Sequence, residues 1–282
     1  MMKRVFAKEI SEAIFQLVLK ANFVLRKDVL KTLQSAYFQE KDFRAKRMLK
    51  ILLENASISR REKIPLCQDT GMVVVFVEKG EEVRIVNGSL NEAINKGIRK
   101  AYREGYLRSS VCTPLSRVNT QGNTPAVIYT RIVKGDKLRL KLCVKGFGAE
   151  NRSQIKMFAP TASEKEIKDF ILKVVKEAGP DACPPFVVGV GIGGTFDKAA
   201  ILAKEATLRE IRNPKSKIQN KIQRLENELL REINKLNIGP MGLGGETTCL
   251  GVNILTFPTH IAGLPVAVNI SCHATRSAKK VL

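Results

Sequence analysis

The chain has 282 residues, of which 44% are hydrophobic, so it can bury a substantial core and is not of the disordered class. Lysine and arginine together number 48 against 27 for aspartate and glutamate, which gives a net charge of +21. No stretch approaches the roughly 20 apolar residues that cross a bilayer, so we expect no membrane association.

The excess of positive charge favours anionic partners, which include nucleic acids, acidic proteins and anionic metabolites. The basic residues are spread along the chain, and only four tyrosines and no tryptophan are available for stacking against bases. We therefore expect no nucleic-acid binding. Most of the charge is interpreted as solvated surface together with a partner interface.

The first 22 residues begin with basic residues and continue as an amphipathic helix that includes Glu9 and Glu12. A signal peptide would have an unbroken apolar run and a small-residue cleavage site. The pattern therefore predicts a structural helix and a cytoplasmic protein.

Three further patterns predict the elements of the first half of the chain. Apolar residues at helical spacing over 10–18, 29–37 and 42–55 predict a layer of three helices, and residues 90–104 predict a fourth helix. The segment MVVVFVEKG (72–80) predicts a buried strand. Residues 125–145 are typical of a hairpin that turns at Lys134-Gly135-Asp136.

In the second half, Ser163 and Glu166 predict a capping box for a helix that ends at Gly179. Residues 183–210 predict a loop, a short strand, a glycine turn and a helix, and residues 215–236 a charged helix. The segment LPVAVNISCHATRS predicts a strand that runs into a loop. We expect a mixed α/β (α+β) fold, in which an N-terminal helical layer (about 1–60) packs on a mixed sheet region (about 61–282) within a single domain, 1–282.

Residues 189–194 match the pattern G-x-G-x-x-G between a strand and a helix, which is the setting of a dinucleotide fingerprint. The strand is short and opens no βαβ series, and no acidic residue ends a second strand about 20 residues later. A dinucleotide-binding oxidoreductase is therefore a remote alternative. The same residues fit an anion or cluster at a helix N-terminus, or a tight strand-to-helix turn.

Six cysteines occur, and none belongs to a CxxC pair, so a zinc finger is not expected and any metal site must be assembled from distant loops. Three of them stand beside polar or rigid motifs: Cys67 precedes QDTG, Cys183 precedes two prolines, and Cys272 precedes HATR. The only two histidines of the chain, His260 and His273, also lie in this last region and favour a site there.

Seven motifs follow one another between about residue 8 and residue 277: IPLCQDTG, LRSSV…NTQGNTPAVI, KGFGAEN, ACPPFVVGVGIGGTFDKAAILAKEA, GPMGLGGETTCLGV, PTHIAGLPVAV and SCHATR. Together they closely resemble the N-terminal domain, or the separate α subunit, of class I fumarases and the related L-tartrate dehydratases. No single motif decides the resemblance, and its specificity comes from their order and number.

The resemblance implies a 4Fe–4S cluster on loops, whose cysteine ligands fall on Cys67, Cys183 and Cys272. Three thiolates for four irons leave one iron with an open position for a substrate hydroxyl and carboxylate oxygen. The remaining cysteines fall outside the ligand positions and are interpreted as small buried hydrophobic residues; they are Cys112, Cys143 and Cys249.

Removal of water from malate requires a base for the proton on carbon and an acid for the leaving hydroxyl. Asp69, two residues after a cluster ligand, is the candidate acid. Gln68, Arg108 and His260 match positions that line the family's substrate site, and Arg108 is the best local clamp for a carboxylate. Gly148 matches a backbone contact. Because the neighbouring Phe147 departs from the family's glycine turn, Gly146 is the alternative.

The chain ends just past the SCHATR motif, whereas fused family members continue into a second domain that supplies a catalytic threonine and basic substrate ligands. The resemblance therefore implies an α subunit that is active with a separate β subunit, in an α2β2-type hetero-oligomer. The reaction implied is the hydration of fumarate to (S)-malate, a step of the tricarboxylic acid cycle. An L-tartrate dehydratase α subunit is the alternative, because its chemistry is the same on a substrate with one more hydroxyl.

Overall fold

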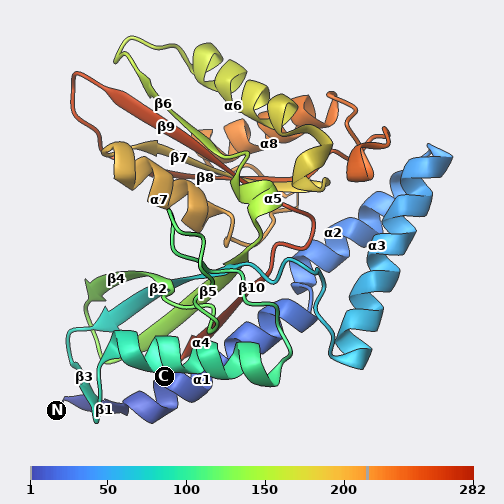
Figure 1. Cartoon of the computed structure of the whole chain (residues 1–282). Coiled ribbons are helices and arrows are strands. Elements are labelled where there is room, and N and C mark those ends of the chain that lie inside the picture. The colour runs from blue at the N-terminus through green and yellow to red at the C-terminus, as the bar shows by residue number, and fades with distance from the viewer. Residues whose placement is uncertain (1, 214–215) are drawn as a thin grey trace. The chain divides into compact units, whose positions relative to one another are not determined.

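The structure is a computed structural model that describes residues 2–213 and 216–282. Helices and strands are mixed along the chain, which confirms the predicted fold class (Figure 1). The elements of the first half are β1 (Lys3–Phe6), α1 (Ala7–Phe23), α2 (Lys27–Gln39), α3 (Phe43–Glu62), β2 (Met72–Gly80), β3 (Val83–Val86), α4 (Leu90–Glu104), β4 (Val127–Val133) and β5 (Leu138–Lys145).

The second half continues with α5 (Phe147–Glu150), β6 (Gln154–Phe158), α6 (Glu164–Ala178), the 3-10 turn η1 (Gly179–Ala182), β7 (Phe186–Gly193), α7 (Phe196–Ala206), α8 (Lys221–Asn234), the 3-10 turn η2 (Pro240–Gly242), β8 (Cys249–Phe257), β9 (Leu264–Ser271) and β10 (Ser277–Val281). Among the described residues, no helix combines the length and the apolar character that crossing a membrane requires.

The chain divides into two compact units. Unit 1 is made of Met1–Arg26, Ala56–Gly146 and Arg276–Leu282, and unit 2 of Lys27–Asn55 and Phe147–Thr275. The three N-terminal helices are therefore divided between the two units: α1 belongs to unit 1, whereas α2 and most of α3 belong to unit 2.

Unit 1 is built on a four-stranded sheet of order β10-β5-β2-β4, with α1 and α4 against one face (Figure 1). The central strand β2 alternates between this helical core, which takes Val73, Val75 and Val77, and the opposite face, where Val74 and Phe76 are also buried. A strand that is buried on both faces reads as a continuous apolar run, which is what the sequence has here.

The predicted hairpin over 125–145 is wrong, although both of its strands exist. β2 lies between β4 and β5, and pairs with β4 in parallel and with β5 in antiparallel register. The connecting turn crosses the end of β2, where the Gly80 N–H donates to the Lys137 carbonyl at 2.9 Å. A Cβ on Gly80 would lie 2.1 Å from the Gly135 oxygen, so a glycine is needed for this crossing.

Helix α4 confirms the predicted helix over 90–104. Ser89 caps it by accepting a hydrogen bond from the Glu92 N–H at 3.3 Å. Its apolar side packs closely on α1, because a Cβ on Gly97 would lie 2.4 Å from the Ser11 carbonyl oxygen. The polar side of α4 remains outside the core.

Unit 2 is built on a four-stranded sheet of order β6-β9-β7-β8. One face packs on α6 and α8 in a large apolar core, and the other face packs on α7 (Figure 1). The predicted capping box is present: the Ser163 hydroxyl accepts from the Glu166 N–H, and the Glu166 carboxylate accepts from the Ser163 N–H. The helix ends at Gly179, as predicted.

The glycine pattern 189–194 serves packing. Gly189 and Gly191 lie inside strand β7 on the face that α7 covers, and a Cβ on either would lie 2.1 Å from a carbonyl oxygen of α7. Only Gly193 and Gly194 form the turn before α7, with φ of +90° and +75°. The interpretation of these residues as a dinucleotide fingerprint is not supported, because the first two glycines lie within the sheet.

The remaining helix predictions were correct in type but inexact in their bounds. The first helix is preceded by the short strand β1, and α3 extends past 55 to Glu62, where Lys63 takes a left-handed φ of 55° and ends it. The predicted charged helix over 215–236 is α8, which begins at Lys221 behind an Asn220 cap. Residue 215 lies outside the described residues.

We predict that Gly191→Ala destabilises the protein by about 1–3 kcal/mol, because the added methyl would meet the Ala199 carbonyl at 2.1 Å. Gly263→Ala is the matched control, since nothing lies within 4 Å of its Cβ position, and its effect should stay within about 0.5 kcal/mol. Urea unfolding measures both. Equal stabilities of the two variants would contradict the packing role of the glycine.

Candidate functional site

The loop that follows Cys67 is held in unit 1 by its own polar side chains. It starts where the Leu66 N–H donates to the Asn22 carbonyl at 2.8 Å and ends where β2 begins. Asp69 accepts the Gly71 N–H at 3.0 Å through Oδ1, which closes a tight turn. Gly71 has a φ of +68°, and a Cβ there would lie 2.6 Å from the Lys145 carbonyl oxygen, so only glycine fits.

A second loop, 107–111, is fastened to the first by side chains from both. The Thr70 hydroxyl donates to the Arg108 carbonyl at 2.6 Å. The fully buried Asn123 donates from Nδ2 to the Gly71 carbonyl at 3.0 Å and accepts the Ser110 N–H at 2.8 Å and the Val111 N–H at 3.2 Å. The structure therefore brings Arg108 and the loop of Gln68 and Asp69 into one region of unit 1.

Tyr102 on α4 holds the loop 67–71 through hydrogen bonds. Its hydroxyl lies 3.0 Å from the Gly71 carbonyl oxygen and also contacts the Thr70 carbonyl oxygen. Burial raises the pKa of Tyr102; Arg276 opposes this rise and Asp69 adds to it. The hydroxyl therefore stays protonated and serves as a hydrogen-bond donor.

A buried arginine faces the carboxylate of Asp69. Arg276 is 4% exposed, and its Nη1 donates to the Asn22 side-chain oxygen at 3.3 Å. A Cβ on Gly146 would lie 3.0 Å from Asp69 Oδ2 and 3.1 Å from Arg276 Nη2, so the carboxylate and the guanidinium flank the same glycine. The pair places a positive charge next to the candidate acid, and Gly146 leaves the room for it.

Cys183 lies in unit 2, on a turn with an unusual backbone. It follows η1, has a φ of 55° and a ψ of 66°, and donates its N–H to the Pro180 carbonyl at 3.0 Å. The left-handed region is uncommon for residues other than glycine, so the surroundings fix this turn. The next residue, Pro184, accepts the Met241 N–H at 2.9 Å.

Cys272 also belongs to unit 2 and follows the last residue of β9. The His273 N–H donates to the Cys183 carbonyl at 3.2 Å, which joins the two cysteine loops. The Thr275 hydroxyl donates to the Cys272 carbonyl at 2.8 Å and closes the loop on itself. Two predicted ligands thus share unit 2, whereas Cys67 belongs to unit 1.

None of the six cysteines forms a disulfide. Cys67, Cys183 and Cys272 are each half-buried, and thiolates are the ligands that iron–sulfur clusters prefer. Within either unit, the described residues gather no three histidine, cysteine or acidic side chains into a group that could hold a metal ion. The chemistry of these thiols therefore fits an iron–sulfur cluster, and the ligand role of each cysteine stays a prediction.

The other three cysteines differ from one another. Cys143 on β5 and Cys249 on β8 are buried, as predicted. Cys112 was expected to be buried too, and this expectation is wrong, because it is half-buried in an isolated bridge with Asn119. Leu115 and Val118 of the same loop are themselves exposed and do not cover it.

His260 and Gly148 lie in unit 2. His260 is exposed in the turn between β8 and β9, where its Nδ1 accepts the Ala262 N–H at 3.1 Å. Gly148 lies in the single turn α5, and a Cβ there would meet only the Asp181 carbonyl, at an ordinary 3.4 Å. A side chain at Gly146 would have to displace the ends of Asp69 and Arg276 slightly, whereas one at Gly148 would make only an ordinary contact. The roles of both remain predictions.

Comparison with known proteins identifies the family of the chain. A family model described as fumarate hydratase (Fumerase) matches residues 11–281. The chain belongs to the fumarate hydratase family. A relative from Methanocaldococcus jannaschii, named putative L(+)-tartrate dehydratase subunit alpha, is 40% identical over 283 residues, which cover 96% of this chain and 97% of the relative.

A second relative is named L(+)-tartrate dehydratase subunit alpha and comes from Escherichia coli K12. It is 31% identical over 218 residues, which cover 75% of this chain and 70% of the relative. Shigella boydii has a relative of the same name and the same identity and coverage. Membership of the fumarate hydratase family confirms the resemblance drawn from the seven motifs.

Three residues of this family member were not predicted as site residues: Tyr102, Asn123 and Arg276. Asn123 and Arg276 stand inside the motifs NTQGN and SCHATR, so their place beside the site could be suspected from the motifs. Tyr102 gave no such signal, because it lies on the apolar stripe of a helix and reads as core.

We predict that Asn123→Ala lowers the free energy of unfolding by about 3 kcal/mol. It removes the acceptor that the Ser110 and Val111 N–H groups share, and one of the two side-chain donors of the Gly71 carbonyl. Asn119→Ala is the matched control in the same loop; that side chain is exposed, and its loss should cost under about 1 kcal/mol. Denaturant unfolding compares them. A cost at Asn123 no larger than that at Asn119 would refute the fastening role.

Cys249 should be the slowest cysteine to be alkylated in the native, metal-free protein. Burial raises the pKa of its thiol to about 12, so at pH 8 almost none is in the reactive thiolate form. Peptide mass spectrometry after timed iodoacetamide treatment measures the order, and in denaturant Cys249 should react like Cys112. Rapid native labelling of Cys249 would show that this part of the core opens.

Proposed function

We propose that the chain is the α subunit of an iron–sulfur hydro-lyase that removes water from a small 2-hydroxy dicarboxylic acid. The observation that carries the proposal is the loop 67–71, which sets a thiol and a carboxyl group two residues apart on a backbone held by Tyr102 and Asn123. Family membership supports the class of reaction.

Cys67, Cys183 and Cys272 would hold a 4Fe–4S cluster, which would supply an iron with an open position to polarise the bond between carbon and the leaving hydroxyl. These thiols fit such a group because each is half-buried on a hydrogen-bonded loop and none is in a disulfide. The metal-ligand role of each cysteine is part of the proposal.

Asp69 is proposed to give a proton to the leaving hydroxyl. Its Oδ1 accepts the Gly71 N–H at 3.0 Å, which fixes the direction of the carboxyl group. General acid catalysis by a positioned side chain contributes about 10²–10⁴-fold to a rate. The neighbouring Arg276 orients this group as a positioning residue.

Arg108 and Gln68 are proposed to bind a substrate carboxylate. Both side chains are exposed on the two loops that Thr70 joins, and the guanidinium can make two parallel hydrogen bonds to a carboxylate. His260 and either Gly146 or Gly148 are the remaining substrate contacts of the proposal. The positive net charge would steer a dianionic substrate to the enzyme.

We infer that L-tartrate is the main substrate, in place of the fumarate and malate pair that the motifs alone favoured. The names of the relatives from M. jannaschii and E. coli support this choice. Hydration of fumarate stays the second candidate, because the matching family model is described as fumarate hydratase. The relatives are named α subunits, which supports a β subunit as the partner, with a catalytic threonine and basic ligands on it.

The test is co-expression with a candidate β subunit, anaerobic purification and separate assays with L-tartrate and (S)-malate. We expect iron and sulfide in the ratio of a 4Fe–4S cluster and a kcat/KM at least tenfold higher for L-tartrate. A higher kcat/KM for (S)-malate would reverse the substrate assignment. Colourless protein that takes up no iron when reconstituted with its partner would end the proposal.

Cys67→Ser, Cys183→Ser and Cys272→Ser should each abolish retention of the cluster, as read from iron content and visible absorption. Cys112→Ser is the matched control, because Cys112 is equally half-buried and is not a predicted ligand. It should keep the cluster. Loss of iron in Cys112→Ser together with full iron in Cys272→Ser would refute the ligand assignment.

Asp69→Asn should lower kcat by about 10²–10⁴-fold while visible absorption and KM change little, because only the proton donor is removed. Asp136→Asn, at an exposed turn of the same unit, removes the same charge and should keep full activity. If Asp69→Asn retains more than a tenth of wild-type kcat, another group supplies the proton.

A further inference from the structure

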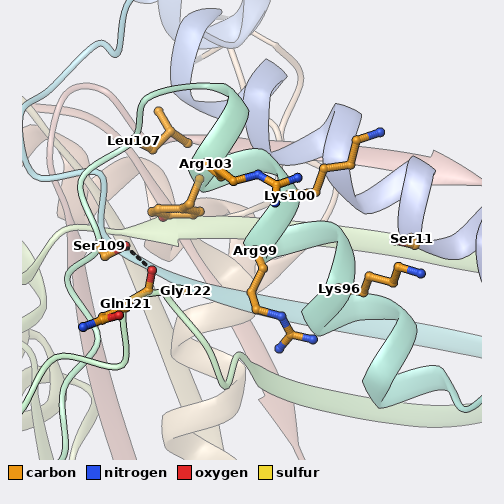
Figure 2. Close-up of a pocket in the computed structure, with 10 residues that line it drawn as sticks. Ser11, Lys96, Arg99, Lys100, Arg103, Leu107, Ser109, Gln121 and Gly122 are labelled. Carbon is orange, nitrogen blue, oxygen red and sulfur yellow. Dashed lines mark hydrogen bonds between the residues drawn. The ribbon is translucent and has the colours of Figure 1, made fainter.

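Unit 1 has a basic pocket on the polar side of α4, and its opposite wall includes part of the loop that carries Arg108. It has a volume of about 620 Å³, within the range of small-molecule sites. Four cations of α4 line it, and a polar wall faces them (Figure 2). The principal lining residues are Lys96, Arg99, Lys100, Arg103, Ser109 and Gln121.

The four cations stand at positions i, i+3, i+4 and i+7 of one helix, so they form a single stripe. Like charges at these spacings repel, and no acidic side chain lines the pocket. Glu12 pairs with Lys100 at 3.1 Å and Glu104 with Arg103 at 3.3 Å, from outside the lining. Among the described residues, neither Lys96 nor Arg99 has an acidic partner.

Arg99 contacts the opposite wall of the pocket. Its Nη1 donates to the Thr124 hydroxyl at 3.4 Å, and a Cβ on Gly122 would lie 2.8 Å from its Cγ. One hydrogen bond lies within this wall, from the Ser109 hydroxyl to the Gln121 carbonyl at 3.2 Å (Figure 2). Arg99 is exposed, and a guanidinium beside a hydroxyl and an amide suits an oxyanion.

The wall of the pocket leads directly into the loops of the candidate site. Ser109 follows Arg108 in the chain, and Gly122 precedes Asn123, which fastens the Gly71 carbonyl and the Ser110 and Val111 amides. Tyr102 lines the pocket and also holds the loop 67–71 through its hydroxyl. A ligand in the pocket would therefore restrain the segment that carries Arg108.

We propose that this pocket binds a small multivalent oxyanion, a phosphate-bearing compound foremost, and that the bound anion orders residues 107–123. The binding rests on the pocket alone, whereas its effect on Arg108 as a substrate ligand rests on the proposed function. Such a ligand regulates the enzyme by stabilising one arrangement of the Arg108 loop.

Calorimetric titration of the full chain with pyrophosphate, at constant ionic strength set by chloride, tests the binding. We expect one saturable site per chain, with a Kd at least tenfold higher for Arg99→Gln and for Lys96→Gln. Arg224→Gln is the matched control: it removes one charge from the exposed side of α8 and should change Kd less than twofold. Equal Kd values in Arg99→Gln and Arg224→Gln would overturn the site.

Gly122→Ala keeps every charge and displaces only Arg99, so an increase in its Kd separates a built site from general attraction to a basic surface. Circular dichroism melts check that each variant is folded. A parallel titration with tricarballylate tells phosphate from carboxylate recognition, and tighter binding of the carboxylate would overturn the phosphate preference. Loss of pyrophosphate binding in the complex with the β subunit would show that the pocket is an interface and overturn the proposal.

Hydrogen exchange tests the second half of the proposal without an activity assay. Pyrophosphate should slow exchange at least threefold in peptides from 107–123 and leave peptides from 221–234 unchanged. Saturable binding with no change in 107–123 would overturn the ordering. Because neither readout needs the cluster or a substrate, failure here is distinguishable from failure of the proposed hydro-lyase activity.

Discussion

One buried amide, that of Asn123, is the interaction on which the candidate site of unit 1 depends. It is fully buried and makes three hydrogen bonds to backbone groups of two loops that have no helix or strand to satisfy them. An unpaired buried backbone group costs about 1–3 kcal/mol, so the amide makes an irregular arrangement stable. Gln68 and Arg108 keep their places because their neighbours are fastened through it.

The sequence predicted the elements whose signals are local. Helix α4 and the capping box of α6 follow from residues within a few positions of one another, and β2 from its apolar run. The position of β2 between β4 and β5 could not be predicted, since it depends on contacts between segments far apart in the sequence. Strands β1, β3, β6 and β10 were missed, because short strands carry little periodicity of their own. Strand β8 was also missed, although it is as long as β2.

The sequence predicted the site residues that lie in recognisable motifs. It could not predict those that belong to the site only through packing. Cys67, Cys183 and Cys272 stand in recognisable motifs, whereas Tyr102 looks like any core residue of an amphipathic helix. The glycine pattern 189–194 has the same limit: spacing in the sequence does not tell a dinucleotide-binding turn from a strand that needs room for a helix. Gly189 faces a helix at close range, and that constraint is visible only in the fold.

The order of segments in unit 1 has a consequence for folding during synthesis. Strand β5 needs β10 along one edge, and β10 is translated only after the whole of the second stretch of unit 2. Until then, β5 presents an open edge of the kind on which nascent chains aggregate. Arg276 immediately precedes β10, so the buried cation beside Asp69 arrives with the strand that closes the sheet. Closure of the sheet and completion of this charge pair are therefore a single late event.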